Sequence, residues 1–305
     1  MNFIPPVKKE SSPFVQLLQL GLYALGGLLI TMLISFSLLA LIYGPAMIMD
    51  PSWMTGGNTK GIGALKIMIT AQQIGLFLVP AIVLGLYEGQ KFNTFYGLSK
   101  PNYNLLLVIL LIMACSNPLM AWVNECNKNM VFPEFLKGVG EWMRRMEDEG
   151  AKTTEAILKM KNIGDFLITL LIIAIVPAIC EEFLFRGALQ RIFLRGIYNH
   201  HIAIWLGAAV FSAIHLQFFG FFPRLFLGAA FGYIYYWTGS LWYPIFAHFL
   251  NNGFAVAVAF YFQMKNMPLD SEDAMPIKWY GVVISAILTL VLFKILKDKA
   301  GKPAN

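Results

Sequence analysis

Long runs without a formal charge constrain the fold of this chain more than any other feature. They extend over residues 11–49, 67–87, 101–124, 166–180, 196–223, 225–264 and 279–293. An α-helix rises 1.5 Å per residue and needs about 20 apolar residues to cross a hydrocarbon core of about 30 Å. Turn residues at 238–240 divide the sixth run into two helices. The sequence therefore predicts an all-α, multi-pass transmembrane bundle of about eight membrane helices.

Composition and charge exclude several other classes of protein. Hydrophobic residues make up 58% of the 305-residue chain and charged residues 13%, whereas an average soluble protein has about 25% charged residues. The net charge is +6, but the positive residues lie between apolar blocks and form no basic face, so no nucleic-acid partner is expected. Cys115, Cys126 and Cys180 have neither a zinc spacing nor an even-numbered disulfide framework, and we expect them to be buried small hydrophobic residues.

The distribution of Lys and Arg predicts the orientation in the membrane. With eight spans, both termini lie on one side together with most flanking positive charges. These are Lys8, Lys9, Lys91, Lys100, Arg186, Arg191, Arg195, Lys294, Lys297, Lys299 and Lys302. Acidic residues Asp270, Glu272 and Asp273 fall on the opposite side. We therefore expect an integral protein of the plasma (inner) membrane with both termini in the cytoplasm.

No repeat of 20 to 50 residues is evident, so the chain is expected to form one helical membrane unit with three parts. Residues 1–160 hold the N-terminal membrane helices and an extramembrane segment. Residues 161–262 form the expected helical core, which holds the polar residues inside the apolar runs, and residues 263–305 hold the last membrane helix and a basic tail. The charged segment 125–161 is expected to form an amphipathic pair of surface helices.

A double carboxylate marks the end of the fourth apolar run. Glu181 and Glu182 are adjacent there, and an ionisable group at membrane depth costs at least about 2.5 to 3.5 kcal/mol. Glu182 precedes Arg186 by four residues, which is the favourable order for an ion pair on a helix. Glu181 lies about 100° around the helix and is free to face a cavity. The alternative is that both acids lie at the headgroup level and have no catalytic role.

Two histidines lie in other uncharged runs. His215 follows Phe211 by one helical turn, and His248 precedes Asn252 by four residues, so that each pair shares a helix face. A lone intramembrane histidine is more often a hydrogen-bonded packing residue. Two histidines, an amide and a double glutamate would each need a buried partner, so we expect them to surround one wet pocket.

These groups have the chemistry that peptide hydrolysis requires. A poorly solvated carboxylate can take a proton from water, and an imidazole can orient that water. A second imidazole and an amide can donate to the developing oxyanion. His and Glu are also zinc ligands, but the spacing His-Glu-x-x-His of soluble zinc proteases is absent.

Three motifs in order carry a resemblance to a known family. Glu181-Glu182-x-x-x-Arg186, Phe211-x-x-x-His215 and His248-x-x-x-Asn252 resemble the signature of the CPBP (ABI) family. That family includes the type II CAAX prenyl endopeptidases and bacteriocin-processing or immunity proteins. The resemblance covers about residues 165–260 and implies an intramembrane endopeptidase.

The resemblance implies a role for each matching residue. Glu181 would activate water, His215 would orient it, and His248 with Asn252 would form the oxyanion hole. Glu182 and Arg186 would support the site. The substrate would be a membrane protein or peptide, with CAAX-type C-terminal processing as one option. Members have been described as metalloproteases and as glutamate-dependent enzymes. We expect no strict cofactor requirement, because the motifs offer one free carboxylate, one or two imidazoles and an amide that is a poor zinc ligand, with zinc held by Glu181, His215 and His248 as the alternative.

The same polar residues also allow functions other than proteolysis. A non-catalytic scaffold or bacteriocin-immunity-type protein would use the same pocket for binding, and a transporter would use it as a proton relay. Ser212, Ser240 and Cys180 are possible nucleophiles, although no Gly-x-Ser-x-Gly elbow is present. Asp165 follows a glycine as in aspartyl intramembrane enzymes but has no intramembrane partner. We also expect the helix that carries Glu181 to extend past Arg191, because Glu181 and His215 would then lie at the same depth in the membrane.

Overall fold

The computed structural model describes residues 10–49, 59–88, 91–267 and 278–301, and these ranges form helices without strands. Seven helical segments in them are long and apolar enough to cross a membrane, which confirms the predicted all-α, multi-pass bundle. They are Pro13–Tyr43, Gly61–Tyr87, Tyr103–Lys128, Ile163–Ile197, Phe218–Thr238, Trp242–Met264 and Trp279–Ala300.

One of the eight predicted spans, in the run 196–223, is a shorter helix in the structure. Helix α11 (His200–Ala213) has 14 residues, so it rises only about 21 Å. It ends early because Ile214 caps it and Leu216 adopts a left-handed conformation, with φ 53°. The predicted run 196–223 is therefore not one continuous helix. A 3-10 turn, η6 (Phe218–Gly220), leads into the next helix, α12 (Phe221–Thr238).

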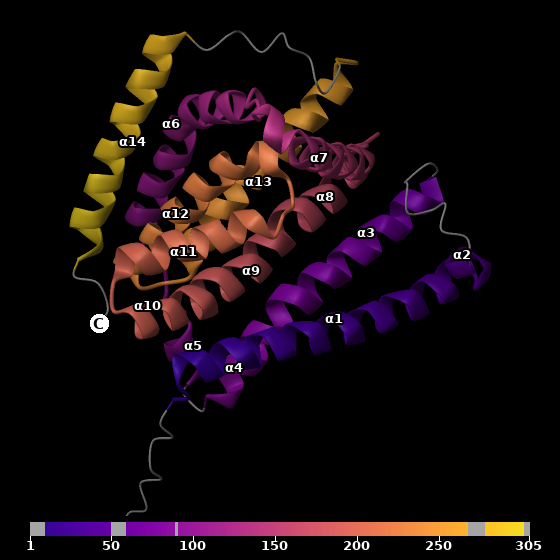
Figure 1. The fold of residues 1–305 in the computed structure, drawn as a ribbon, viewed down its shortest axis with the longest axis horizontal. Helices are drawn as coiled ribbons and strands as arrows, with labels where there is room; N and C mark the ends of the chain where they lie inside the picture. The colour runs from indigo at the N-terminus through magenta and orange to yellow at the C-terminus, as the bar shows by residue number, and fades with distance from the viewer. Residues whose placement is uncertain (1–9, 50–58, 89–90, 268–277, 302–305) are drawn as a thin grey trace, which may run out of the picture.

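The N-terminal helices form an arm beside the rest of the bundle (Figure 1). Helix α1 (Pro13–Tyr43) packs along α3 (Thr59–Gln73), the π-helix η2 (Ile74–Leu78) and α4 (Val79–Tyr87), and a short α2 (Ala46–Met49) follows α1. Close approach of α1 to η2 requires glycine in both elements. A Cβ on Gly27 would come within 2.3 Å of the Gly75 carbonyl oxygen.

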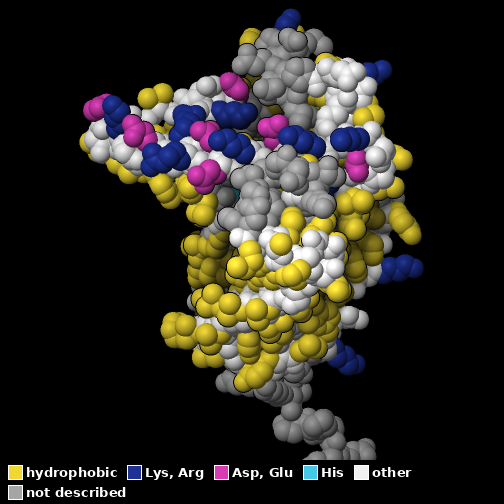
Figure 2. All heavy atoms as spheres, turned by 90° about the vertical axis from the view of Figure 1, so that its right-hand side faces the viewer, with side chains coloured by type: hydrophobic (Ala, Val, Ile, Leu, Met, Phe, Trp, Pro, Cys, Tyr) yellow, Lys and Arg dark blue, Asp and Glu magenta, His cyan; other side chains and the backbone are white. Residues whose placement is uncertain are grey.

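The opposite side of the bundle is formed by α6 (Tyr103–Lys128) and α14 (Trp279–Ala300), which lie against each other (Figure 1). Between α4 and α6 lies the short α5 (Phe92–Phe95). After α6, the turn η3 (Glu134–Leu136) and the amphipathic α7 (Lys137–Ile157) follow. The predicted pair of surface helices is thus one helix, because residues 125–128 complete α6. Figure 2 shows a band of charged side chains at this end of the molecule, beside a surface of apolar side chains.

The helix that carries the double carboxylate is the longest of the seven. It continues from α8 (Ile163–Leu170) through the π-helix η4 (Leu171–Ile175), α9 (Val176–Glu182) and the π-helix η5 (Phe183–Gln190) to α10 (Arg191–Ile197). The expected extension past Arg191 is therefore confirmed, and Glu181 lies midway along a 35-residue segment. The chain returns through α11, whose C-terminal end brings His215 back to the middle of the bundle.

Helices α12 and α13 (Trp242–Met264) complete the core around this long helix. They meet at the predicted turn, where Gly239 has φ 63° and caps α12. The expectation for the cysteines is confirmed for Cys180, which is buried, but Cys126 is exposed.

Several charges used to predict the orientation lie outside the described residues, namely Lys8, Lys9, Asp270, Glu272, Asp273 and Lys302. Among the others, Arg186 is buried inside the bundle, which corrects its expected place in a cytoplasmic basic cluster. Arg191 and Arg195 lie at the end of the bundle where Glu10 is found.

Candidate active site

Glu181 and Glu182 lie at the C-terminal end of α9, where both side chains are buried. Their environments differ. Glu182 is fully buried, and its Oε1 accepts hydrogen bonds from Arg186 Nη1 at 2.6 Å and His248 Nδ1 at 2.8 Å. The expected i,i+4 ion pair is therefore present. Glu181 makes no ion pair with Lys or Arg in the described residues, so its carboxylate is the one available for chemistry.

His248 lies between the two carboxylates. Its Nδ1 carries the hydrogen that Glu182 accepts, so Nε2 faces Glu181 Oε2 at 3.8 Å. The ring stacks on Phe231, with centroids 5.3 Å apart and planes 22° from parallel. Glu182 and Phe231 thus fix both the tautomer and the plane of this imidazole, as an orienting carboxylate does for a histidine at an active site.

Gln73 contributes a contact that the sequence interpretation missed. Its Nε2 donates to Glu181 Oε1 at 3.1 Å, across 108 residues of sequence. Its Oε1 is buried and has no hydrogen-bond partner among the described residues. Gln73 ends α3 directly before η2, inside an uncharged run. A polar amide inside an apolar span was the one signal that could have found it.

Arg186 ties the site to α12. Its Nη2 donates to the Gly228 carbonyl at 2.9 Å, and its guanidinium lies over the rings of Phe211 at 4.8 Å and Phe231 at 5.3 Å. One turn later, Gln190 Nε2 donates to the Gly232 carbonyl at 3.1 Å. Gly228 and Gly232 are four residues apart, a small-xxx-small spacing that usually serves close helix packing. Here their carbonyls also accept hydrogen bonds from side chains of the neighbouring helix.

Phe211 connects the two histidines. Its ring centroid lies 5.1 Å from that of His215 and 6.0 Å from that of His248. His215 Nδ1 donates to the Phe211 carbonyl at 2.7 Å, which leaves Nε2 as the free nitrogen. In the described part of the chain, His215 makes no hydrogen bond to Glu181, Glu182 or His248. The spacing Phe-x-x-x-His therefore sets the orientation of His215 through its own helix turn.

Asn252 donates a hydrogen bond to a backbone carbonyl that lacks its usual helical donor because of a proline. Pro177 lacks the N–H that would bond to Ile173 four residues earlier, and Ile173 lies in the π-helix η4. Asn252 Nδ2 donates to this carbonyl at 3.1 Å, and its Oδ1 accepts from Asn251 Nδ2 at 3.1 Å. The amide has a second N–H hydrogen, which is the one that could donate to a substrate.

The described residues do not form a metal site. Among them, no group of three or more His, Cys, Asp or Glu side chains is arranged to hold a metal ion. The zinc alternative through Glu181, His215 and His248 would require these side chains to move.

The other possible nucleophiles are engaged elsewhere. Ser212 Oγ donates to the Phe221 carbonyl at 2.7 Å, and Ser240 Oγ donates to the Ser99 carbonyl at 2.9 Å. Asp165 caps the start of α8 by accepting from the Lys161 backbone N–H at 2.9 Å. These contacts give each side chain a structural role.

Comparison with known proteins concerns the family of this chain. The uncharacterized protein YpbD of Bacillus subtilis (strain 168) is 28% identical over 204 residues, which cover 64% of this chain and 86% of that protein. No solved structure matches the chain. Residues 163–254 match the family model of type II CAAX prenyl endopeptidase Rce1-like proteins. The resemblance predicted from the three motifs is therefore confirmed, because residues 163–254 are similar to the type II CAAX prenyl endopeptidase Rce1-like proteins.

Proposed function

We propose that this chain is an intramembrane endopeptidase that cleaves a membrane-associated protein or peptide with water activated by Glu181. The family match supports an intramembrane protease at the family level. The observation that carries the proposal is the buried Glu181 carboxylate, which has Gln73 on one oxygen and His248 facing the other. CAAX-type C-terminal processing is one form of this activity.

In the proposed first step, Glu181 takes a proton from a water molecule that attacks the scissile carbonyl. His215 orients this water through Nε2, the nitrogen that its bond to Phe211 leaves free. The carbonyl carbon gains a bond to the water oxygen, and its oxygen becomes negatively charged. Enclosure in an apolar bundle strengthens each of these electrostatic interactions, because apolar surroundings screen charge less than bulk water does.

In the proposed second step, His248 and Asn252 stabilise the oxyanion. Because Glu182 holds the hydrogen on Nδ1 of His248, donation from Nε2 requires the imidazolium form. Asn252 would donate through its second N–H hydrogen. The proton on Glu181 then passes to the leaving amine, and the peptide bond breaks.

We also propose that the protein lies in the plasma membrane with both termini in the cytoplasm.

The variant Glu181→Gln tests this proposal. The amide is nearly isosteric with the carboxylate but cannot act as a base, so hydrolysis of a reporter substrate should fall to background while the thermal unfolding midpoint stays near that of the wild type. The substrate must first be found by comparing the termini of membrane proteins from cells with and without the active chain. Cleavage by Glu181→Gln at the wild-type rate would refute the assignment of the base and favour the scaffold function.

Glu182→Gln is a comparison at the neighbouring carboxylate, which supports the site through Arg186 and His248. It leaves the buried Arg186 without its charged partner, so its main effect should be a loss of stability of about 3 to 5 kcal/mol. Metal analysis of the same preparations addresses the cofactor. We expect activity without stoichiometric zinc, and zinc whose removal ends activity and whose return restores it would establish a metalloprotease instead.

A further inference from the structure

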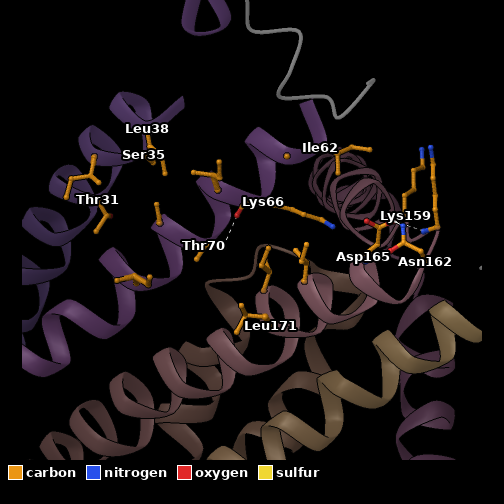
Figure 3. Close-up of a pocket in the computed structure, with 18 residues that line it drawn as sticks. Thr31, Ser35, Leu38, Ile62, Lys66, Thr70, Lys159, Asn162, Asp165 and Leu171 are labelled. Atoms are coloured by element: carbon orange, nitrogen blue, oxygen red, sulfur yellow. Dashed lines mark hydrogen bonds between the residues drawn. The ribbon is translucent and has the colours of Figure 1, made fainter. Parts of the chain in front are cut away.

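A large groove lies between the N-terminal arm and the start of the long helix (Figure 3). Its volume is about 1060 Å³, and its walls come from α1, α3, the connection between α7 and α8, and η4. Apolar side chains line most of its length, including Ile34, Ile67 and Leu171. Ile34 is 61% exposed and Leu171 is 49% exposed, so the groove is open on the side where a membrane helix meets lipid.

The charge of the groove is gathered at one end. Lys66, Lys159 and Lys161 line it there together with a single carboxylate, Asp165. Asp165 is already engaged, because its Oδ2 accepts from the Lys161 backbone N–H at 2.9 Å and from Asn162 Nδ2 at 3.2 Å. The polar end of the groove therefore has an excess of positive charge, next to the charged helix α7.

Lys66 is the least expected member of this group. It lies inside the apolar segment Gly61–Tyr87, is partly buried, and points from α3 across the groove toward Asp165 and Asn162 (Figure 3). Its Nζ donates to Thr169 Oγ1 at 3.0 Å, but no carboxylate of the described residues comes within ion-pair distance. An ammonium at this depth without an ion-pair partner is costly, so an anion that reaches it is stabilised.

We propose that this groove binds one anionic phospholipid, with its phosphate at Lys66, Lys159 and Lys161 and an acyl chain along the apolar walls. A basic pocket between membrane helices is the kind of site that holds an anionic headgroup. A lipid fits the opening toward the bilayer and the order of groups in the groove, with lysines at the end near α7 and apolar residues beyond them. Its phosphate supplies a direct anionic partner for Lys66, on which Asp165 acts only from beyond ion-pair distance.

Lipid binding to the purified full-length chain in detergent tests this proposal. Native mass spectrometry would count bound phosphatidylglycerol and phosphatidylcholine in separate titrations. We expect the wild type to bind phosphatidylglycerol at least about fivefold more tightly than phosphatidylcholine. The variant Lys66→Met should lose about fivefold in affinity for phosphatidylglycerol and little for phosphatidylcholine, since one lysine contributes about that factor at a lipid headgroup.

Two variants serve as controls for Lys66→Met. Lys66→Arg keeps the charge and should keep the preference, whereas Lys152→Met removes an exposed lysine of α7 outside the groove and should change nothing. Glu181→Gln should also bind lipid normally, so this test is separate from that of peptidase activity. Equal binding of the two lipids by the wild type, or an unchanged preference in Lys66→Met, would overturn the proposal. Displacement of phosphatidylglycerol by inorganic phosphate alone would also overturn it, because the acyl chain would then contribute nothing.

Discussion

At the scale of single residues, Gln73 shows how the candidate base is held. It comes from α3, outside the Rce1-like segment, and its amide donates to one oxygen of Glu181. The amide cannot be reversed without placing its own oxygen against a carboxylate, so the neighbouring charge fixes its orientation. The other end of the amide is then a buried acceptor beside Glu181, where it can accept a hydrogen bond from an attacking water.

We therefore predict that Gln73→Met lowers kcat by about 10- to 100-fold and leaves KM nearly unchanged. The estimate follows from the loss of a hydrogen bond to a charged group, about 1.5 to 3 kcal/mol, where the substrate itself is not contacted. The neighbouring Gln72 is exposed, so Gln72→Met is the matched control and should behave like the wild type. Steady-state kinetics with the reporter substrate distinguish the two variants, and equal rates for both would remove Gln73 from the site.

The sequence could identify part of this site and not the rest. Glu181, Glu182 and His248 lie together as expected, because the spacings within the first and third motifs place them on helix faces that pack together. Gln73 could not be assigned in this way, since its contact spans 108 residues and no spacing in the sequence encodes it. The orientation of the Asn252 side chain also depends on its hydrogen bond to the Ile173 carbonyl in a neighbouring helix, and only the packed structure shows this contact.

At the scale of helices, three π-helical segments surround the site. Segment η2 follows Gln73, η4 contains Ile173, and η5 follows Glu182. Each of the first two is followed by a valine and a proline, Pro80 and Pro177, which remove a backbone donor from the helix. Local widening of this kind is common at functional sites because it frees carbonyls and changes the direction of side chains. Hydrophobic runs alone predict the helices but not these interruptions.

The contact between η5 and α12 gives a prediction at this scale. Gly232 accepts from Gln190, and a Cβ at this position would come within 2.8 Å of both Gln190 Oε1 and Ile204 Cγ2. Gly232→Ala should therefore lower the stability by about 1 to 3 kcal/mol. The control is Gly26→Ala in α1, where a Cβ meets nothing within 4 Å, and no destabilisation is expected there. Thermal unfolding in detergent compares the two, and equal midpoints would mean that α11 and α12 can separate without cost.

At the scale of the whole molecule, the segment before α1 is bound to the end of the long helix. Arg191 donates to Glu10 through both terminal nitrogens, at 3.0 and 2.5 Å, and Arg195 Nη1 lies 2.8 Å from Glu10 Oε2. The Ser11 backbone N–H also donates to Glu88 Oε2 at 2.9 Å, which joins the same segment to the end of α4. Charge counting predicted that Arg191 and Arg195 lie on the same side of the membrane as the N-terminus. It could not show that the arginines have carboxylate partners there.

This ion-pair cluster makes the stability of the bundle depend on pH. Burial tends to raise the pKa of Glu10, but hydrogen bonding and the charges of Arg191 and Arg195 outweigh it and hold the pKa below its ordinary value of 4.5. A carboxyl whose pKa is lowered by folding stabilises the fold above that ordinary value, and this stabilisation is lost as the pH falls toward the pKa in the folded state.

Glu10→Gln should therefore lower the thermal unfolding midpoint at pH 7, and the difference from the wild type should narrow as the pH falls from about 5 to 3. The exposed Glu141 of α7 makes no ion pair in the described residues, so Glu141→Gln is the control and should differ little from the wild type throughout. Midpoints measured in detergent over this range decide the matter. If the difference for Glu10→Gln is the same at pH 3 as at pH 7, the variant acts through packing, because protonation of the wild-type carboxyl would otherwise have abolished the advantage of the ion pairs.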